Sequence, residues 1–301
     1  MITFLHSYTG ELAALLVAVF WTITALSFEM ASKKVGSLPV NIIRLGFALV
    51  FLSIFSFFYR GHILPDDASS HAWFWLSLSG LVGFVFGDYF LFHSYTLISS
   101  RIAMLVMTFV PPVTALIGWL VLGEQMSPIQ LLGMFLTVSG IGMTIAGRNR
   151  DTGKFSLHYP IKGLFFAFLG VLGQAGGLVL SKYGMQEYDP FASTQIRIIA
   201  GFAGFIVIVA LGRKFGLVAG AFKNSKAMLG ITSGSFFGPF LGVSFSLLAI
   251  KHTSTGIAAT LMAIVPILII PPAAWLFKQK ISWIDIVGAV ISVGGVVLFF
   301  V

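Results

Sequence analysis

Asp88 is the residue of this 301-residue chain whose type and position most clearly imply chemistry. It lies in Gly87-Asp88-Tyr89, about 10 residues before the end of a long apolar stretch, which is roughly 15 Å along a helix. A charge at such a depth in a membrane costs at least about 2.5–3.5 kcal/mol and usually faces an interior cavity. Because burial makes a carboxyl group easier to protonate, we expect Asp88 to carry a coupling proton or to hold a substrate ammonium group. The alternative is a structural pair with a Ser, Tyr or Arg of a neighbouring helix.

Arg44 and Arg197 are two further charges inside apolar stretches, each about two turns from the start of its own stretch. A guanidinium there could bind a carboxylate or phosphate through two hydrogen bonds. An arginine near a helix end can instead extend its charged head to the membrane surface. The structural role is the one favoured for both arginines, with Glu29 at the end of the first stretch as the predicted partner of Arg44.

Uncharged side chains at the middle of other stretches are predicted to bind a small molecule. Trp21 offers a stacking surface and Gln174 an amide, which suits a zwitterion with an apolar side chain. The alternative for Trp21 is a position facing lipid. Flexible thioethers suit a pocket for varied ligands, although Met also fills core gaps. The predicted pocket lining therefore adds Met104, Met107, Thr108 and Met262.

Pro111 and Pro266 are predicted to mark gating kinks. Proline removes a backbone hydrogen bond and bends a helix, and these two prolines occupy matched places in two stretches. The alternative is that membrane helices simply tolerate proline more often than soluble helices do.

Several kinds of chemistry are excluded or disfavoured. The chain has no cysteine, which excludes disulfides, thiolate catalysis and cysteine-based metal sites. No pair of histidines has metal-ligand spacing, and no nucleotide-binding or Gly-x-Ser-x-Gly pattern occurs. The net charge of +8 comes mainly from short loops, so nucleic-acid binding is not expected. We also expect no cleaved signal peptide, no metal and no cofactor.

Ten apolar stretches must position these residues. Charged residues make up 9% of the chain, against about 25% in soluble domains, and a spanning helix needs about 20 apolar residues. The predicted spans are Leu12–Phe28, Val40–Phe58, Trp73–Tyr95, Ile102–Leu122, Leu131–Ala146, Gly163–Leu180, Phe191–Leu211, Met228–Ile250, Ile257–Phe277 and Ile284–Val301.

The two halves of the chain repeat each other. At an offset of 155 residues, Gly87 matches Gly242, Met107 matches Met262, Val110-Pro111 matches Val265-Pro266, and Gly140 matches Gly295; Arg44 matches Arg197 at 153. Each half holds five spans, and an odd number places the two copies in opposite orientations. The predicted fold is an all-α integral membrane protein with ten transmembrane helices, arranged as two inverted five-helix repeats around a central cavity. Residues 1–150 form the first repeat and 151–301 the second.

Loop charges predict the orientation. Of the 18 Lys and Arg residues, 13 lie in loops on the side opposite the termini and three on the side of the termini. The positive-inside rule therefore predicts both termini outside.

Two copies of one motif carry a family resemblance. The first runs from Phe109-Val110-Pro111 to Gly123-Glu124 and Gln130–Gly133, and the second includes Val265-Pro266 and Ile284–Gly288. In these segments the chain resembles the EamA family of the drug/metabolite transporter superfamily. The resemblance implies a helical basket around a cavity and transport of small metabolites, often amino acids. Two features depart from the family pattern: Gln279 replaces the second glutamate, and family members usually keep both termini in the cytoplasm.

The predicted function is secondary active transport of small polar metabolites by alternating access, as export of amino acids or related compounds, with a proton as the candidate coupling ion. The protein is expected in the plasma (inner) membrane as a multi-pass monomer or homodimer, and not as an enzyme. The alternatives are an intramembrane enzyme acting on a lipid-linked substrate, which would need a catalytic cluster, and a passive channel or facilitator, which would show polar rings.

Overall fold

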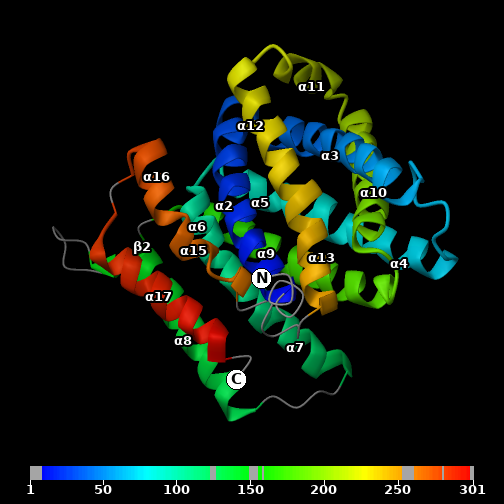
Figure 1. Ribbon diagram of the computed structural model, residues 1–301. Helices are drawn as coiled ribbons and strands as arrows, with labels where there is room; N and C mark the ends of the chain where they lie inside the picture. Colours follow the sequence, from blue (N-terminus) through cyan, green and yellow to red (C-terminus); the bar gives the residue numbers. More distant parts are fainter. Residues whose placement is uncertain are drawn as a thin grey trace, which may run out of the picture.

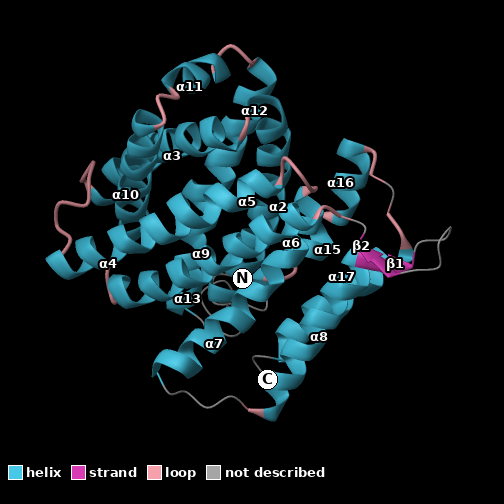
Figure 2. Ribbon diagram, turned by 180° about the vertical axis from the view of Figure 1, so that it is seen from behind, coloured by secondary structure: helices cyan, strands magenta, loops and turns pink. Residues whose placement is uncertain are grey.

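A computed structural model covers the chain and describes residues 9–122, 127–148, 155–157, 159–252, 261–279 and 281–298. Helices form nearly all of this part (Figure 1). The exception is a short antiparallel hairpin of β1 (Ala146–Arg148) and β2 (Phe155–Leu157) at the edge of the molecule (Figure 2).

Five helical units form the first half. They are α2 (Thr9–Val35); α3 (Ser37–Arg60); α4 (Ser70–Gly80) continued by η1 (Leu81–Asp88) and α5 (Tyr89–Ser94); α6 (Ser100–Val106) continued by η2 (Met107–Phe109) and α7 (Val110–Leu122); and α8 (Pro128–Ile145). Glu124, which carried part of the family resemblance, lies outside the described residues.

The second half repeats this order with one added surface helix. Its units are α9 (Ile161–Met185); α10 (Pro190–Leu211); α11 (Phe215–Ala221); α12 (Ser225–Ser235) continued by η3 (Phe236–Gly242) and α13 (Val243–His252); α15 (Val265–Leu268) with α16 (Ile270–Phe277); and α17 (Trp283–Leu298). Six helices of the described part are long and apolar enough to cross a membrane, and shorter apolar helices occupy the other four predicted spans. The beginning of the ninth predicted span and the end of the tenth lie outside the described residues.

Side-chain caps fix several helix starts. Ser69 accepts a hydrogen bond from the amide of Ala72 at the start of α4, and Asp189 accepts one from Ala192 at the start of α10. Such caps satisfy amides that have no partner within the helix. At the end of α3, Gly61 takes a left-handed conformation, φ +76°, which glycine adopts without strain.

Matched helices of the two halves run antiparallel to each other, which confirms the predicted inversion. In the α3–α10 pair, Ser53 bonds to Gln195 while Gly46 faces Phe202. Residue numbers therefore rise along one helix as they fall along the other. In the α8–α17 pair, likewise, Gly133 faces Gly295 while Gly140 faces Gly288 and Ser292.

The first helix of each half packs on the third helix of the other half. Helix α2 lies against α12, η3 and α13, and α9 lies against α4, η1 and α5 (Figure 1). The α8–α17 pair lies at one side of this bundle (Figure 2). This exchange of partners interleaves the repeats, so both contribute to the interior. The exact division at residue 150 stays a prediction.

Irregular backbone occurs at matched places in the two halves. The third helix of each half contains a π-helical segment, η1 or η3, at an offset of 155 residues. The fourth helix is also interrupted in both halves, by η2 before Val110-Pro111 and by a turn at Ala263-Ile264 before Val265-Pro266. Interruptions of this kind often occur at functional sites. The gating role of Pro111 and Pro266 stays a prediction.

Candidate functional site

Arg44 and Asp88 form an ion pair inside the helix bundle. Arg44 lies two turns into α3 and Asp88 ends η1; the guanidinium Nη2 is 2.6 Å from the carboxylate Oδ2. Arg44 is 2% exposed and Asp88 is 6% exposed. This arrangement corresponds to the alternative in which Asp88 pairs with an arginine of a neighbouring helix. A pair so far from water is stable only when further hydrogen bonds satisfy both groups.

Two amides supply those hydrogen bonds. Gln174 of α9 donates from Nε2 to Asp88 Oδ1 at 2.5 Å. Asn41 accepts from Arg44 Nε at 3.2 Å and donates to the backbone oxygen of Asp88 at 3.3 Å. Both carboxylate oxygens are therefore bound, one by Arg44 of the first half and the other by Gln174 of the second half. Asp88 connects the two repeats.

Arg197 is the second buried guanidinium of this region. It is 5% exposed, and its Cζ lies 4.9 Å from the centroid of the Phe84 ring. The Cζ of Arg44 lies 5.5 Å from the same centroid. An aromatic face attracts cations, so Phe84 helps to hold both. We call Arg44, Asp88, Gln174, Asn41 and Arg197 the buried polar cluster; its formal charge is +1.

Neither arginine extends its charged head out of the bundle, and the structural role expected for both stays a prediction. Both are enclosed by neighbouring helices. Glu29 as the partner of Arg44 is wrong: Glu29, 0% exposed, binds Lys33 and accepts hydrogen bonds from the amide and hydroxyl of Ser100. Its carboxylate therefore lies at the start of α6, where a negative charge is favoured by the helix dipole.

The other predicted ligand residues are spread over several places. Trp21 contacts Gly242 and borders the small apolar cluster that contains Met262. The Thr108 hydroxyl lies 2.8 Å from that of Ser292 on α17. The two remaining methionines, Met104 and Met107, pack against the main core. Of the predicted substrate-binding residues, the structure brings only Gln174 to Asp88; the binding roles of the others stay predictions.

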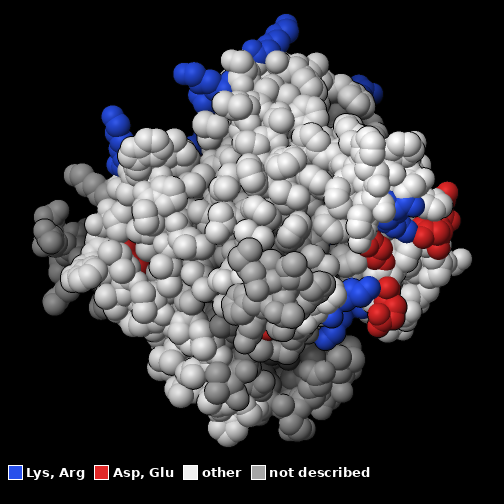
Figure 3. All heavy atoms as spheres, in the orientation of Figure 1, with Lys and Arg blue, Asp and Glu red and all other residues white. Residues whose placement is uncertain are grey.

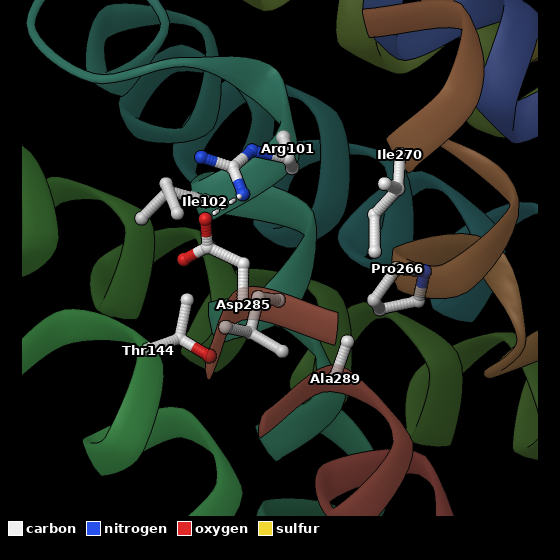
Figure 4. Close-up of a pocket in the computed structure, with 8 residues that line it drawn as sticks. Arg101, Ile102, Thr144, Pro266, Ile270, Asp285 and Ala289 are labelled. Carbon is white, nitrogen blue, oxygen red and sulfur yellow. Dashed lines mark ion pairs between the residues drawn. The ribbon is translucent and has the colours of Figure 1, made fainter. Parts of the chain in front are cut away.

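A second polar group, missed in the sequence, connects the repeats at one end of the bundle. Arg101 Nη1 lies 3.0 Å from Asp285 Oδ2, and the two side chains point at each other in Figure 4. Arg101 also donates to Gln279 at 3.2 Å and to Tyr159 at 3.3 Å. Burial raises the pKa of Tyr159. We call these four residues the Arg101 latch. The one available signal was the position of Arg101 directly after Ser99-Ser100, where two spans almost touch.

The cavity beside the Arg101 latch is small. It holds about 10 Å³ and is bounded by Arg101 and Asp285 with Ile102, Thr144, Pro266 and Ala289 (Figure 4). That volume is room for about one water molecule. Little free space is therefore left beside the Arg101 latch, and a central cavity wide enough for a metabolite stays a prediction.

A third polar group connects the halves at the other end. Arg60 at the end of α3 binds Asp67, and the Tyr188 hydroxyl donates to Asp67 at 2.7 Å. The Tyr188 hydrogen bond, with the Arg60 charge, lowers the pKa of Asp67. Burial and the same hydrogen bond raise the pKa of Tyr188 to about 12. Both ends of the bundle are thus joined by polar contacts in this conformation.

Surface charge is uneven. Figure 3 shows Lys and Arg without acidic neighbours at the top, over α11 and the start of α12, and a mixed group at the right. We call the end that carries Lys33, Arg101 and Lys223 the basic end. Among the described residues, no three His, Asp or Glu side chains are grouped as metal ligands.

These features define a class: a multi-pass helical membrane protein made of two inverted five-helix repeats, with charges buried between them. The sequence model of the EamA-like transporter family matches residues 8–146 and again residues 161–301. The chain belongs to this family, within the drug/metabolite transporter superfamily, and is a transporter.

Two comparisons give further context. The uncharacterized transporter YoaV of Bacillus subtilis (strain 168) is 29% identical over 135 residues, which is 44% of this chain and 46% of that protein. The match thus spans about half the length of YoaV. A solved crystal structure shares the fold with a TM-score of 0.62 and 16% identity, over 96% of each chain.

Proposed function

We propose that this transporter is a secondary active carrier that moves small polar metabolites by alternating access, in the direction of export, with amino acids or related compounds as substrates. The observation that carries the proposal is that Asp88 is bound by Arg44 from one repeat and by Gln174 from the other. In carriers built from inverted repeats, the substrate and coupling-ion sites lie at the interface between the repeats. We place the transporter in the plasma membrane. We also propose that residues 1–150 form its first repeat and residues 151–301 its second.

Protonation of Asp88 supplies a physical route to proton coupling. The ionised carboxylate attracts Arg44 strongly because the pair is shielded from water. Adding a proton removes the negative charge and weakens the connection between α3, η1 and α9. The two repeats are then freer to move relative to each other, and the substrate-binding site between them can open. Pro111 and Pro266, next to the interrupted fourth helices, would accommodate the movement.

Flux into proteoliposomes tests the proposal. We expect uptake of labelled amino acids that saturates with concentration and accelerates when the same unlabelled amino acid is present inside. Rapid uptake without saturation would indicate a channel or facilitator instead. Chemical conversion of a lipid-linked substrate would indicate an enzyme.

Asp88→Asn should separate proton coupling from substrate movement. The Asn side chain has the same shape as Asp, but its amide does not take up and release a proton as a carboxyl group does. We expect accumulation driven by a pH gradient to fall to the level of protein-free liposomes, while exchange of internal for external substrate continues. The control is Asp66→Asn, a loop carboxylate beside His62 that should leave both activities unchanged. Full gradient-driven accumulation by Asp88→Asn would leave Asp88 only a structural role.

A further inference from the structure

Arg197 has no ion-pair or hydrogen-bond partner among the described residues. Its guanidinium makes no ion pair or hydrogen bond there, and its Nε is buried without an acceptor. A buried charge that lacks partners is costly, so it calls for an explanation. Its repeat counterpart Arg44 is fully bound, by Asp88 and Asn41.

The internal repeat explains why Arg197 lacks a carboxylate. The position in the second half that corresponds to Asp88 is Val243. The two arginines are therefore served by one acid, which binds Arg44 within 2.6 Å. The buried polar cluster keeps an excess positive charge inside the membrane. A bound anion would neutralise that charge and supply the missing acceptors.

A second unpartnered group lies on the same face of α10. The Ser193 hydroxyl is fully buried and has no hydrogen-bond partner among the described residues. Residues four apart in a helix lie one above the other, so Ser193 and Arg197 can donate to one ligand. On one side the Arg197 guanidinium packs closely on Gly83, where a built Cβ would lie only 3.3 Å from Nη2.

We propose that Arg197 and Ser193 bind the carboxylate of the transported molecule. A single guanidinium charge matches a monoanion, and the nearby Asp88 disfavours a doubly charged group such as phosphate. The carboxylate could belong to a zwitterionic amino acid, whose ammonium Asp88 would attract, or to a simple organic acid. This inference names the substrate group of the proposed carrier and rests on that function.

Thermal unfolding of the purified full-length protein in acetate tests the inference without knowledge of the substrate. Ligands that bind the folded state raise the unfolding temperature. We expect acetate to raise it by several degrees relative to chloride at equal ionic strength, and the uncharged isostere acetamide to have no effect. Glycine and methylamine form further arms: glycine should act at least as well as acetate, and methylamine should not act.

Two variants and a control connect the effect to Arg197. Arg197→Gln should abolish the acetate shift and raise the unfolding temperature without ligand, because an unpaired charge is removed. A merely structural arginine would give the opposite result without ligand. Arg197→Lys keeps the charge but not the planar fork, and should weaken acetate binding at least tenfold. The loop variant Arg213→Gln should behave as wild type.

Failure of the inference and failure of the proposed function are distinguishable. An absent acetate shift in the wild type, or an undiminished shift in Arg197→Lys, overturns carboxylate binding by Arg197 even if counterflow is observed. A normal shift that depends on Arg197, in a protein without saturable flux, supports the anion site and contradicts the carrier.

Discussion

Arg44→Met is expected to destabilise the protein by about 3–5 kcal/mol, the effect typical of removing one partner of a buried ion pair. The variant leaves the Asp88 carboxylate deep in the bundle with only the Gln174 amide as a side-chain donor. Met has a similar length and keeps the apolar contacts, so lost packing contributes little. Unfolding in detergent with increasing denaturant measures the change.

The matched control for this prediction is the double variant Arg44→Met with Asp88→Asn. It removes both charges together, and we expect it to recover most of the lost stability, because neither ion of the pair is left without its partner. A double-mutant cycle then gives the energy of the pair. If the double variant is as unstable as Arg44→Met, the Arg44–Asp88 pair is not the cause.

Gly140→Ala and Gly295→Ala should each destabilise by about 1–3 kcal/mol or more, the range for overpacked sites. A Cβ at Gly140 would lie 2.5 Å from the backbone oxygen of Gly288, and one at Gly295 would lie 2.5 Å from the backbone nitrogen of Thr137. Backbone atoms cannot rotate away as side chains can. The α8 and α17 helices would have to separate along their whole contact.

The same two helices supply matched controls. A Cβ at Gly142 of α8 or at Gly294 of α17 meets nothing within 4 Å. Alanine is a better helix former than glycine by about 1 kcal/mol, so Gly142→Ala and Gly294→Ala should be neutral or stabilising. Equal losses at Gly140 and Gly142 would contradict the α8–α17 contact. Thermal unfolding of the four variants under one condition provides the comparison.

Much of the fold could be predicted from the sequence because lipid imposes a simple rule. Every spanning segment must be apolar and about 20 residues long, so the spans are visible as stretches such as Val40–Phe58. The repeat was visible because Gly140 and Gly295 are needed where two backbones approach closely. Five spans in each half then require inversion, which the antiparallel α3–α10 pair confirms.

The pairing of the buried charges could not be predicted in the same way. In a helix that is apolar on all sides, hydropathy does not say which face points inward, so the directions of Arg44 and Arg197 were open. The place of Glu29 at the end of the preceding span favours it as the partner of Arg44, but Glu29 caps α6 instead. The pair of Arg101 and Asp285 joins residues far apart in the chain, and no local pattern connects them.

The irregular helix segments could be predicted from the sequence only in part. The prolines predicted interruptions near Pro111 and Pro266, and both fourth helices are interrupted directly before these residues. The π-helical segment that ends at Asp88 has no proline, whereas its counterpart η3 contains Pro239. At η1, Gly87 lies against Gly173 of α9, and this contact between distant residues cannot be read from the local sequence.

The central claim is that the inverted repeats expose one site alternately to the two sides of the membrane. Labelling of a single cysteine from each side tests this claim. The chain has no native cysteine, so Met107→Cys places one thiol beside η2. We predict that a membrane-impermeant thiol reagent labels this cysteine from either side of oriented proteoliposomes. Asp285→Asn breaks the Arg101 latch, so it should increase labelling from the basic end and decrease labelling from the opposite end. Labelling from one side only, unchanged by Asp285→Asn, would contradict alternating access.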